Sequence, residues 1–357
     1  MQTTIMDCIQ RVPGLAERAV RENPTDSNGF FDRHRDALSR IDEIILVGSG
    51  TSFTSSMTAA PVMEKVGGLR VTVMLPDAVL RSSRLLLEFA CYLFVSQTGT
   101  SKLTQRALQV LQARGLLCAA VSESGDTPMA KMTEDWIDIH CGTEEYPMRT
   151  IGYSMTVFTL IQFAMQMGLH RKTLAAEDFE RYGGEALAAA NALRRLIPQA
   201  DEWILQNRRA MLRSDCIALT GAGDLYGVAL EGAVKLWEMP QIPAMGYELD
   251  EVMHGPNFGF SGRHCLIVLD DGVNRSDEAR AICKYMKNEM QNGFLVGPAS
   301  LDAADFGIRE AGNTFRSLLY AGVVQVISYE LALNQGRNLL VRDKHEVMYS
   351  YFNSHFA

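Results

Sequence analysis

Short apolar runs alternate along the chain with longer segments in which apolar residues recur every three or four positions. "DEIILVG" (42–48) is typical of a buried strand, and the segment 51–66 after it has helical periodicity. The runs "LRVTVML", "CYLFVSQ" and "LLCAAVS" predict further strands, and "TSKLTQRALQVLQARG" predicts a helix that ends at Gly115. "DWIDIH" predicts a fifth strand, followed by a helix near 150–169. This alternation predicts a parallel sheet with helices on both faces.

The same pattern restarts in the second half of the chain. The segment 174–212 is helical in pattern and rich in charge, as expected of a connection between domains. After it, "DCIALTG" predicts a strand, "AGDLYG" a loop, and 228–239 a helix. "HCLIVLDD" and "NGFLVG" predict later strands, with helices near 276–291 and 314–333. Two successive units of similar size indicate a distant internal duplication.

A chain of 357 residues is long enough for two domains. We therefore predict an α/β protein with two tandem domains, each a doubly wound parallel sheet flanked by helices. The expected divisions are an N-terminal helical segment (1–40), a first domain (41–172), a helical connection (173–212), a second domain (213–335) and a C-terminal tail (336–357).

The composition is that of a soluble globular protein, with 47% hydrophobic and 21% charged residues. The net charge of −8 argues against nucleic-acid binding and against an anionic membrane surface. Seven scattered cysteines form no CxxC pair, which indicates buried thiols in a reducing compartment. The first residues do not resemble a signal peptide, and the apolar segment 151–169 contains polar residues typical of a core helix. We expect a cytoplasmic protein without a metal or a cofactor.

The loop after the first predicted strand is "GSGTSF" (48–53). Ligands bind at the carboxyl ends of the strands in open parallel sheets, so this loop is a candidate binding element. Its glycines permit close approach of the backbone, and Thr51 and Ser52 can cap the next helix. Phe53 stands where a dinucleotide fingerprint needs a third glycine. Many strand–helix loops look similar, so this loop alone defines no ligand.

The loop after the third strand, "SQTGTSKLTQ" (96–105), is richer in hydroxyl groups. Ser96, Thr98, Thr100 and Ser101 precede a helix, and Gly99 frees the backbone. Hydroxyls, backbone amides and the positive end of a helix dipole together favour an anion such as a phosphate monoester. The alternative is an ordinary helix capped by Ser and Thr, and composition alone does not separate the two.

Charged residues also lie on one stripe of the helix "ALEGAVKLWEM" (229–239). Glu231, Lys235 and Glu238 are spaced i, i+4 and i+7, so they share one side of the helix. Such a stripe is usually a solvated face. The alternative is that these groups are held together for proton chemistry.

Several of these motifs together resemble the sugar isomerase (SIS) domain. "GTS" after the first strand and "SQTGTS" after the third correspond to its two loops, the second of which is commonly SQSGET. "ALEGAVKLWEM" followed by "YELDEVMHGP" resembles the isomerase half of glucosamine-6-phosphate synthase, with ALEGALKLKE and GELKHGP. His254 follows Glu238 by sixteen residues, as in that family, and "QGRNLL" resembles its QPRNLA. The resemblance covers nearly the whole chain past residue 40.

The resemblance implies two tandem SIS domains in a homodimer whose active sites are shared between subunits. It implies that Glu238 moves a proton between C1 and C2 of a sugar phosphate. It makes His254 the ring-opening residue, contributed by the partner subunit, and Glu231 and Lys235 supporting residues. The sugar phosphate would be bound by Thr51, Ser52, Ser96, Gln97, Thr98 and Ser101.

The sequence also departs from the synthase. It shows no glutaminase domain, and Cys8 is not at a processed terminus, so ammonia transfer from glutamine is not expected. The lysine that forms a Schiff base in the synthase tail corresponds to Val341 here. Thr100 replaces the glutamate of SQSGET.

These departures favour one of the related reactions. The fructosamine-6-phosphate deglycases keep the glutamate and the histidine, and their ketosamine substrates already carry the nitrogen. We therefore expect cleavage of an amino-acid-linked hexosamine 6-phosphate to hexose 6-phosphate and free amine. The retained Lys235 keeps an aldose–ketose isomerase as the alternative. A non-catalytic sugar-phosphate sensor is the third possibility, although a sensor has no need of Glu238 paired with a His254-Gly255-Pro256 motif.

A few other charged residues have two possible roles. "GTEEYPMRT" corresponds to a family segment that leads into a helix lining the site. Glu144, Glu145 and Arg149 are expected either to contact the leaving amine or phosphate or to lie in a solvated loop. Glu251 is expected either to orient His254 or to be an exposed loop charge.

Overall fold

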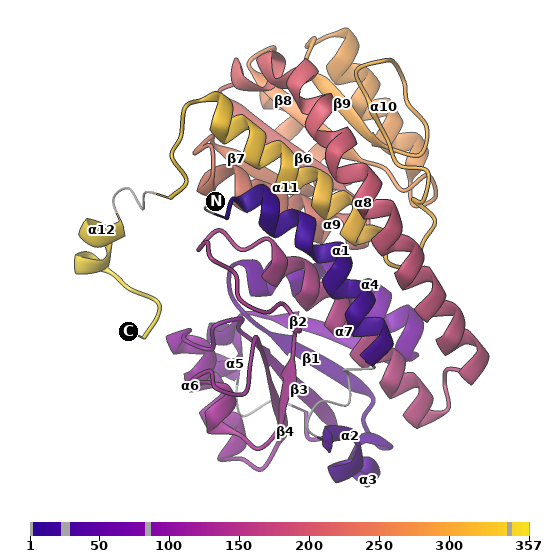
Figure 1. Ribbon diagram of the computed structural model, residues 1–357, viewed down its shortest axis with the longest axis vertical. Coiled ribbons are helices and arrows are strands. Elements are labelled where there is room, and N and C mark those ends of the chain that lie inside the picture. Colours follow the sequence, from indigo (N-terminus) through magenta and orange to yellow (C-terminus); the bar gives the residue numbers. More distant parts are fainter. Residues whose placement is uncertain (1–2, 23–28, 83–86, 341–344, 357) are drawn as a thin grey trace. The chain divides into compact units, whose positions relative to one another are not determined.

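The computed structural model describes residues 3–22, 29–82, 87–340 and 345–356, and this part of the chain contains two five-stranded sheets (Figure 1). The strand order is β2-β1-β3-β4-β5 in one sheet and β10-β9-β8-β6-β7 in the other. Every pairing between neighbouring strands is parallel. Both orders are doubly wound, with the first strand of the unit inside the sheet. The predicted α/β class with two tandem parallel sheets is confirmed.

The first sheet is built from the apolar runs that the sequence pattern indicates. Its strands are β1 (Glu43–Val47), β2 (Arg70–Met74), β3 (Ala90–Val95), β4 (Leu117–Ser122) and β5 (Trp136–Asp138). The associated helices are α4 (Thr51–Gly67), α5 (Pro76–Ser82), α6 (Lys102–Gln112), η3 (Ala130–Met132) and α7 (Ile151–Arg171). β1 and β3 are buried along their whole length, as expected for central strands of a parallel sheet.

The second sheet repeats this arrangement. Its strands are β6 (Cys216–Gly221), β7 (Ala244–Glu248), β8 (His264–Leu269), β9 (Gly293–Gly297) and β10 (Phe306–Gly307). The associated helices are α9 (Asp224–Glu238), η4 (Glu251–Met253), η5 (Pro256–Gly259), α10 (Ser276–Asn288) and α11 (Arg316–Asn334). α9 and α11 pack against each other, and α9 also packs on β6 and β7.

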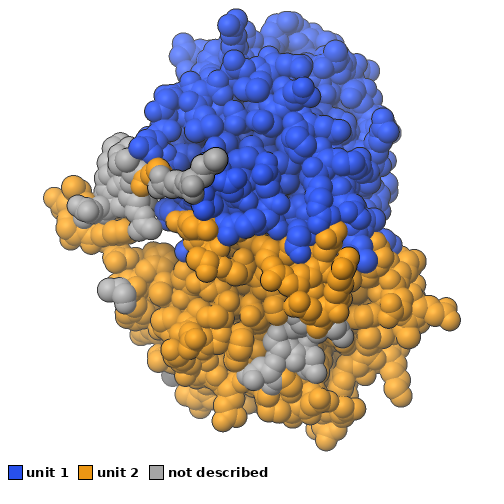
Figure 2. Space-filling model, in the orientation of Figure 1, with its two compact units in different colours: residues 1–14, 146–150, 185–339 blue, residues 15–145, 151–184, 340–357 orange. Residues whose placement is uncertain are grey.

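The remaining helices are α1 (Ile5–Glu22), α2 (Phe30–Arg33), α3 (Arg35–Leu38), α8 (Ala176–Leu212) and α12 (His345–Tyr351). The chain divides into two compact units (Figure 2), and each unit contains one of the two sheets. Unit 1 comprises 1–14, 146–150 and 185–339, and unit 2 comprises 15–145, 151–184 and 340–357. The change of unit at residues 184 and 185 falls inside α8, so this helix contributes to both units.

The turn between the first strand and the first helix is the same in both units. Gly50 before α4 has φ 59° and ψ −132°, and Gly223 before α9 has φ 59° and ψ −127°. This backbone conformation is accessible to glycine and strained for other residues. The shared turn and the shared strand order support the internal duplication that the sequence pattern indicates.

α9 and β7 are among the elements that differ from the sequence expectation, as are the unpredicted α5 and β10. α9 begins at Asp224, four residues before the predicted start, because the turn at Gly223 already directs the chain into the helix. β7 was not predicted, although it pairs with β6 over five residues. A Cβ at Gly246 would lie 2.7 Å from the Ala229 carbonyl oxygen, so a glycine is needed where α9 crosses this strand. That glycine weakens the apolar alternation by which strands are recognised.

The apolar segment 151–169 forms most of α7, which is buried at nearly every position and packs against α4. This confirms the prediction of a core helix. Among the described residues, no helix has the length and hydropathy needed to cross a membrane.

A buried carboxyl group links α8 and α11 within unit 1. Glu330 on α11 is 9% exposed and interacts with Asp201 on α8. Burial, and after it the Asp201 carboxylate, raise the pKa of Glu330 to about 7 against a weaker opposing effect of Arg208. The folded protein therefore favours the protonated form of Glu330.

This pair predicts a pH dependence of stability. The contribution of Glu330 is fully present below its ordinary pKa of 4.5 and is lost as the pH rises through about 7. We expect Glu330→Gln to melt a few degrees above the wild type near pH 8 and close to it near pH 5, by circular dichroism. Glu310→Gln is the control. Glu310 pairs with the cation Arg195, so this substitution should not change how the melting temperature depends on pH. If the melting temperatures of wild type and Glu330→Gln depended on pH in the same way, the raised pKa of Glu330 would be contradicted.

Candidate active site

The two loops that the sequence predicts to bind phosphate open at the same edge of the first sheet. β1 and β3 are neighbours, with Val47 opposite Phe94, and the strand order reverses between them. Thr51 and Ser52 form the first turn of α4 after β1. The loop 96–101 follows β3 and leads into α6. All six predicted phosphate-binding residues therefore lie at the switch point of unit 2, where doubly wound sheets bind ligands.

The loop 96–101 is held in shape by its own hydrogen bonds. The Gly99 amide donates to the Ser96 carbonyl oxygen over 3.0 Å, and Gly99 has φ 66°. The Thr98 and Thr100 hydroxyls are 2.8 Å apart, so Thr100 supports the loop where the family sequence has glutamate. Thr104 donates to the Ser101 hydroxyl oxygen over 2.9 Å. The Phe356 amide in the tail also donates to the Thr100 carbonyl oxygen over 2.9 Å, so the loop is supported by its own bonds and by the tail.

Gln97 has a different environment from the hydroxyl residues around it. Its Nε2 donates to Glu144 Oε2 over 3.2 Å. Its side chain crosses Gly152 so closely that a Cβ there would lie 1.8 Å from Gln97 Oε1. Glu144 is 8% exposed and also accepts the amides of Ile151 (2.9 Å) and Gly152 (3.0 Å) at the start of α7. The structure thus gives Glu144 a third role, as the buried cap of α7, and Gln97 connects the loop to that cap.

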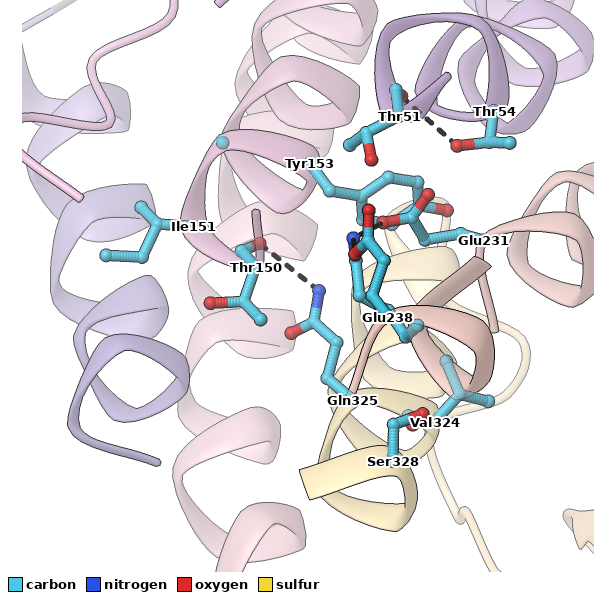
Figure 3. Close-up of polar contacts among 12 residues, drawn as sticks. Thr51, Thr54, Thr150, Ile151, Tyr153, Glu231, Glu238, Val324, Gln325 and Ser328 are labelled. Carbon is cyan, nitrogen blue, oxygen red and sulfur yellow. Dashed lines mark hydrogen bonds and ion pairs between the residues drawn. The ribbon is translucent and has the colours of Figure 1, made fainter. Parts of the chain in front are cut away.

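The charged stripe of α9 is not a solvated face. The side chains of Glu231 and Lys235 are both 0% exposed, and that of Glu238 is 35% exposed. Lys235 Nζ lies 3.2 Å from Glu231 Oε1 and also donates to Glu238 Oε2. Both carboxylates, labelled in Figure 3, therefore contact one ammonium group, and Glu231 is buried whereas Glu238 is partly exposed. Of the two alternatives left open by the sequence, the wet face is excluded.

This arrangement fixes the charge state of the lysine. Burial by itself lowers the pKa of Lys235, but the Glu231 and Glu238 carboxylates outweigh it and hold the pKa above the ordinary lysine value. Lys235 is therefore an ammonium ion at neutral pH and not a free amine. It can stabilise negative charge that develops beside it.

His254 lies on the loop between η4 and η5, and its side chain is 65% exposed. Its Nδ1 bonds the Asp250 carbonyl oxygen over 2.9 Å and lies 3.7 Å from Asp250 Oδ2. The carbonyl and then the carboxylate of Asp250 raise the pKa of His254. Because Nδ1 is engaged, Nε2 is the nitrogen that can exchange a proton with a substrate. The orienting contact comes from Asp250, one residue before the Glu251 considered from the sequence.

The structure thus brings Glu231, Lys235 and Glu238 together in unit 1 and groups the six predicted phosphate-binding residues in unit 2. His254 bonds Asp250 rather than a residue of α9. Val341, the position of the family's tail lysine, lies outside the described residues. Among the residues that the structure describes, no group of three or more His, Cys, Asp or Glu side chains could hold a metal ion.

Two polar features of unit 1 were missed from the sequence. Gln325 is fully buried on α11, and its Nε2 donates to the Thr150 carbonyl oxygen over 3.2 Å (Figure 3). Arg316 at the start of α11 donates to Asp224, which lies in the segment "AGDLYG" that was predicted to be a loop. The sequence did contain a signal for Gln325, which stands inside the apolar run "LLYAGVVQVISY". A glutamine buried in such a run needs a hydrogen-bond partner.

Comparison with known proteins agrees with the sequence motifs. The model of the SIS domain family matches residues 37–167. The isomerizing glutamine–fructose-6-phosphate aminotransferase of Caulobacter vibrioides is 27% identical over 311 residues, which cover 85% of this chain and 51% of that protein. The chain spans about half the length of the curated relatives it matches.

Solved structures share the whole fold. A phosphosugar isomerase candidate from Clostridium difficile 630 has a TM-score of 0.89 at 21% identity and covers 99% of this chain and 100% of its own. The C-terminal domain of the glucosamine-fructose-6-phosphate aminotransferase of Francisella tularensis has a TM-score of 0.83 at 17% identity, covering 94% and 96%. These findings agree with the resemblance: residues 37–167 match the SIS domain, the chain is similar in sequence to the isomerizing aminotransferases, and it shares the fold of the Francisella domain.

The buried trio on α9 predicts a specific pattern of stability. Lys235→Met leaves the Glu231 carboxylate buried without its counter-ion, which should cost roughly 3–5 kcal/mol of unfolding free energy. The double variant Lys235→Met/Glu231→Leu removes both charges and should recover most of that loss in urea denaturation. Lys131→Met is the control for the single change, because Lys131 pairs with Asp126 at an exposed position and its loss should cost less than about 1 kcal/mol. Equal losses in the single and double variants would show that Glu231 is not stabilised by Lys235.

Proposed function

We propose that this chain, which contains a SIS domain over residues 37–167, is a phosphosugar-processing deglycase. It would cleave an amino-acid-linked hexosamine 6-phosphate, of fructosamine or glucosamine type, to hexose 6-phosphate and free amine. The observation that carries this proposal is Val341, which stands where the family's tail has its Schiff-base lysine. Without that lysine, a substrate that already carries its nitrogen fits, and Glu238 beside the buried Lys235 and Glu231 supplies a carboxylate for proton transfer.

The phosphate of the substrate would bind at the switch point of unit 2. Thr51 and Ser52 begin α4, and Ser101 precedes the first residue of α6. Two helix N-termini with hydroxyl groups suit a phosphate monoester, because amides and helix dipoles stabilise its charge. This assigns binding to Thr51, Ser52, Ser96, Thr98 and Ser101, with Gln97 acting through the loop.

The reaction would then proceed on the open-chain ketosamine. His254 Nε2 donates a proton to the ring oxygen as the ring opens. Glu238 removes a proton from C1, the carbon that bears the nitrogen, and an enaminol forms. Return of the proton to C2 gives an imine at C1, and water hydrolyses the imine to the aldehyde of hexose 6-phosphate and the free amine. Lys235 Nζ donates to Glu238 Oε2 and so orients the carboxylate that accepts the proton.

The position of His254 supports a homodimer with shared active sites. Its side chain is 65% exposed, and Phe258 in the adjoining η5 is 91% exposed. A catalytic histidine and a large apolar side chain that are both exposed are suited to contact a second copy of this chain. We propose that His254 of each subunit acts in the site that contains Glu238 of the other subunit.

An aldose–ketose isomerase of amino-sugar or sugar phosphates is the second candidate. The observation in its favour is Lys235, whose positive charge beside Glu238 suits an enediolate as well as an enaminol. A non-catalytic sensor of sugar phosphate is the third candidate, and it would bind the ligand without turnover.

The decisive experiment is incubation of the full chain with fructosamine 6-phosphates and with 2-aminohexose 6-phosphates. Free amine and hexose 6-phosphate are measured together. A deglycase releases both in equal amounts. Interconversion of aldose and ketose phosphates without amine release would replace the deglycase by the isomerase, and binding without any turnover would leave a sensor.

The assignment of Glu238 as the proton-transfer base predicts the effect of Glu238→Gln. We expect turnover to fall by about 10²–10⁴-fold, because general acid–base catalysis contributes that much. Phosphosugar affinity, measured by calorimetry, should stay close to that of the wild type because the phosphate loops are unchanged. Glu289→Gln is the matched control at the end of α10 and should keep full activity. Near-normal turnover of Glu238→Gln would remove Glu238 from the mechanism.

The shared site predicts complementation between two inactive variants. Glu238→Gln and His254→Ala subunits are mixed and allowed to exchange. One of the two sites in each heterodimer then contains both Glu238 and His254, so about half of the activity per heterodimer should return. Absence of recovery in heterodimers whose exchange is verified by native mass spectrometry would place both residues in the same subunit.

A further inference from the structure

The switch point of unit 1 is filled by an internal ion-pair cluster. Arg316, the first residue of α11, places Nη2 2.6 Å from Asp224 Oδ1 and 3.0 Å from Asp271 Oδ2. Asp224 is the first residue of α9 and is 2% exposed, and Asp271 follows β8 and is 4% exposed. One guanidinium group therefore connects the starts of α9 and α11 to the loop after β8.

Each end of this cluster is anchored to the backbone. Asp271 Oδ1 accepts the amides of Val273 (2.8 Å) and Asn274 (2.7 Å), so its carboxylate has a fixed direction. Asp224 stands at the N-terminus of α9, where a negative charge is stabilised by the helix dipole. Burial raises the pKa of Asp224, and Arg316 opposes this effect. The carboxylate form of Asp224 thus depends on the guanidinium group of Arg316.

Asp224 shares one side of α9 with the charged trio. Glu231, Lys235 and Glu238 follow it by 7, 11 and 14 residues. At 100° per residue, all three positions lie within about 40° of Asp224 around the helix axis. A restraint on Asp224 therefore restrains the rotation of the stripe that carries the trio.

α9 is closely packed against its neighbours, so its rotation determines where its side chains lie. A Cβ at Gly232 would lie 2.6 Å from Leu219 on β6 and 3.4 Å from Val324 on α11. The helix thus lies tightly between β6 and α11, and a small rotation would move the Glu238 carboxylate relative to a bound substrate. Reaction rates are steeply sensitive to such displacements.

We propose that Arg316 is a positioning residue, which sets the rotation of α9 through Asp224 and thereby places Glu238 and Lys235 for proton transfer. The role assigned to Glu238 rests on the proposed function. Arg316 acts through Asp224, so its loss should lower kcat and leave substrate binding largely intact.

The test compares Arg316→Gln and Arg316→Lys with the wild type. For Arg316→Gln we expect kcat to fall by about 10- to 100-fold, with KM changed by less than about threefold. Arg316→Lys keeps the positive charge and should recover most of that loss. Arg263→Gln is the matched control, because Arg263 binds Asp215 at an exposed position before β6 and should leave kcat unchanged.

A second measurement does not require activity. Amide hydrogen exchange over 224–238 should be faster in Arg316→Gln than in wild type, and close to wild type in Arg316→Lys. If the wild-type protein turns over no phosphosugar, the proposed function is wrong. The hydrogen-exchange measurement would still show whether Arg316 holds α9 in place. Unchanged kcat or unchanged exchange in folded Arg316→Gln overturns the proposal. Loss of cooperative melting in both variants assigns Arg316 to folding alone and overturns it too.

Discussion

The ammonium group of Lys235 lies in the protein interior, where an unpaired charge would be strongly destabilising. It is tolerated because Glu231 and Glu238 on the same helix both contact it. Only Glu238 extends to solvent, so the trio presents one carboxylate outward and keeps the other two charges inside. The packing of α9, the glycine at 246 and the cluster at Asp224 all hold the helix that carries this trio.

The two units use the same backbone plan for different purposes. The strand order and the turn at Gly50 or Gly223 are shared, so both units offer a helix N-terminus at a switch point. In unit 2 the helix begins with Thr51 and Ser52, which leaves the site suited to an external anion. In unit 1 the helix begins with Asp224, whose own carboxylate takes the place of an anion and is neutralised by Arg316. One unit is thus suited to binding phosphate, and the other to holding the proposed base.

Much of the site could be predicted from short motifs because its residues are close in sequence. The loop 96–101 and the α9 stripe each lie within one element, so spacing alone shows which side chains share a face. The roles of Gln97 and Glu144 could not be predicted, because their contact joins residues 47 apart across a loop. The sequence also could not distinguish Asp250 from Glu251 as the partner of His254, because the two residues are adjacent in the same short turn.

By itself the sequence determined the α/β class, the repeated strand–helix order and the identity of the charged residues on α9, since all follow from local periodicity and motif spacing. Only the tertiary structure decided whether the α9 stripe faces water. The same i, i+4, i+7 spacing occurs on solvated helices, and burial depends on which elements pack over it. Here packing excludes water from Glu231 and Lys235, and this turns an ordinary charge pattern into a buried ion cluster with one exposed carboxylate.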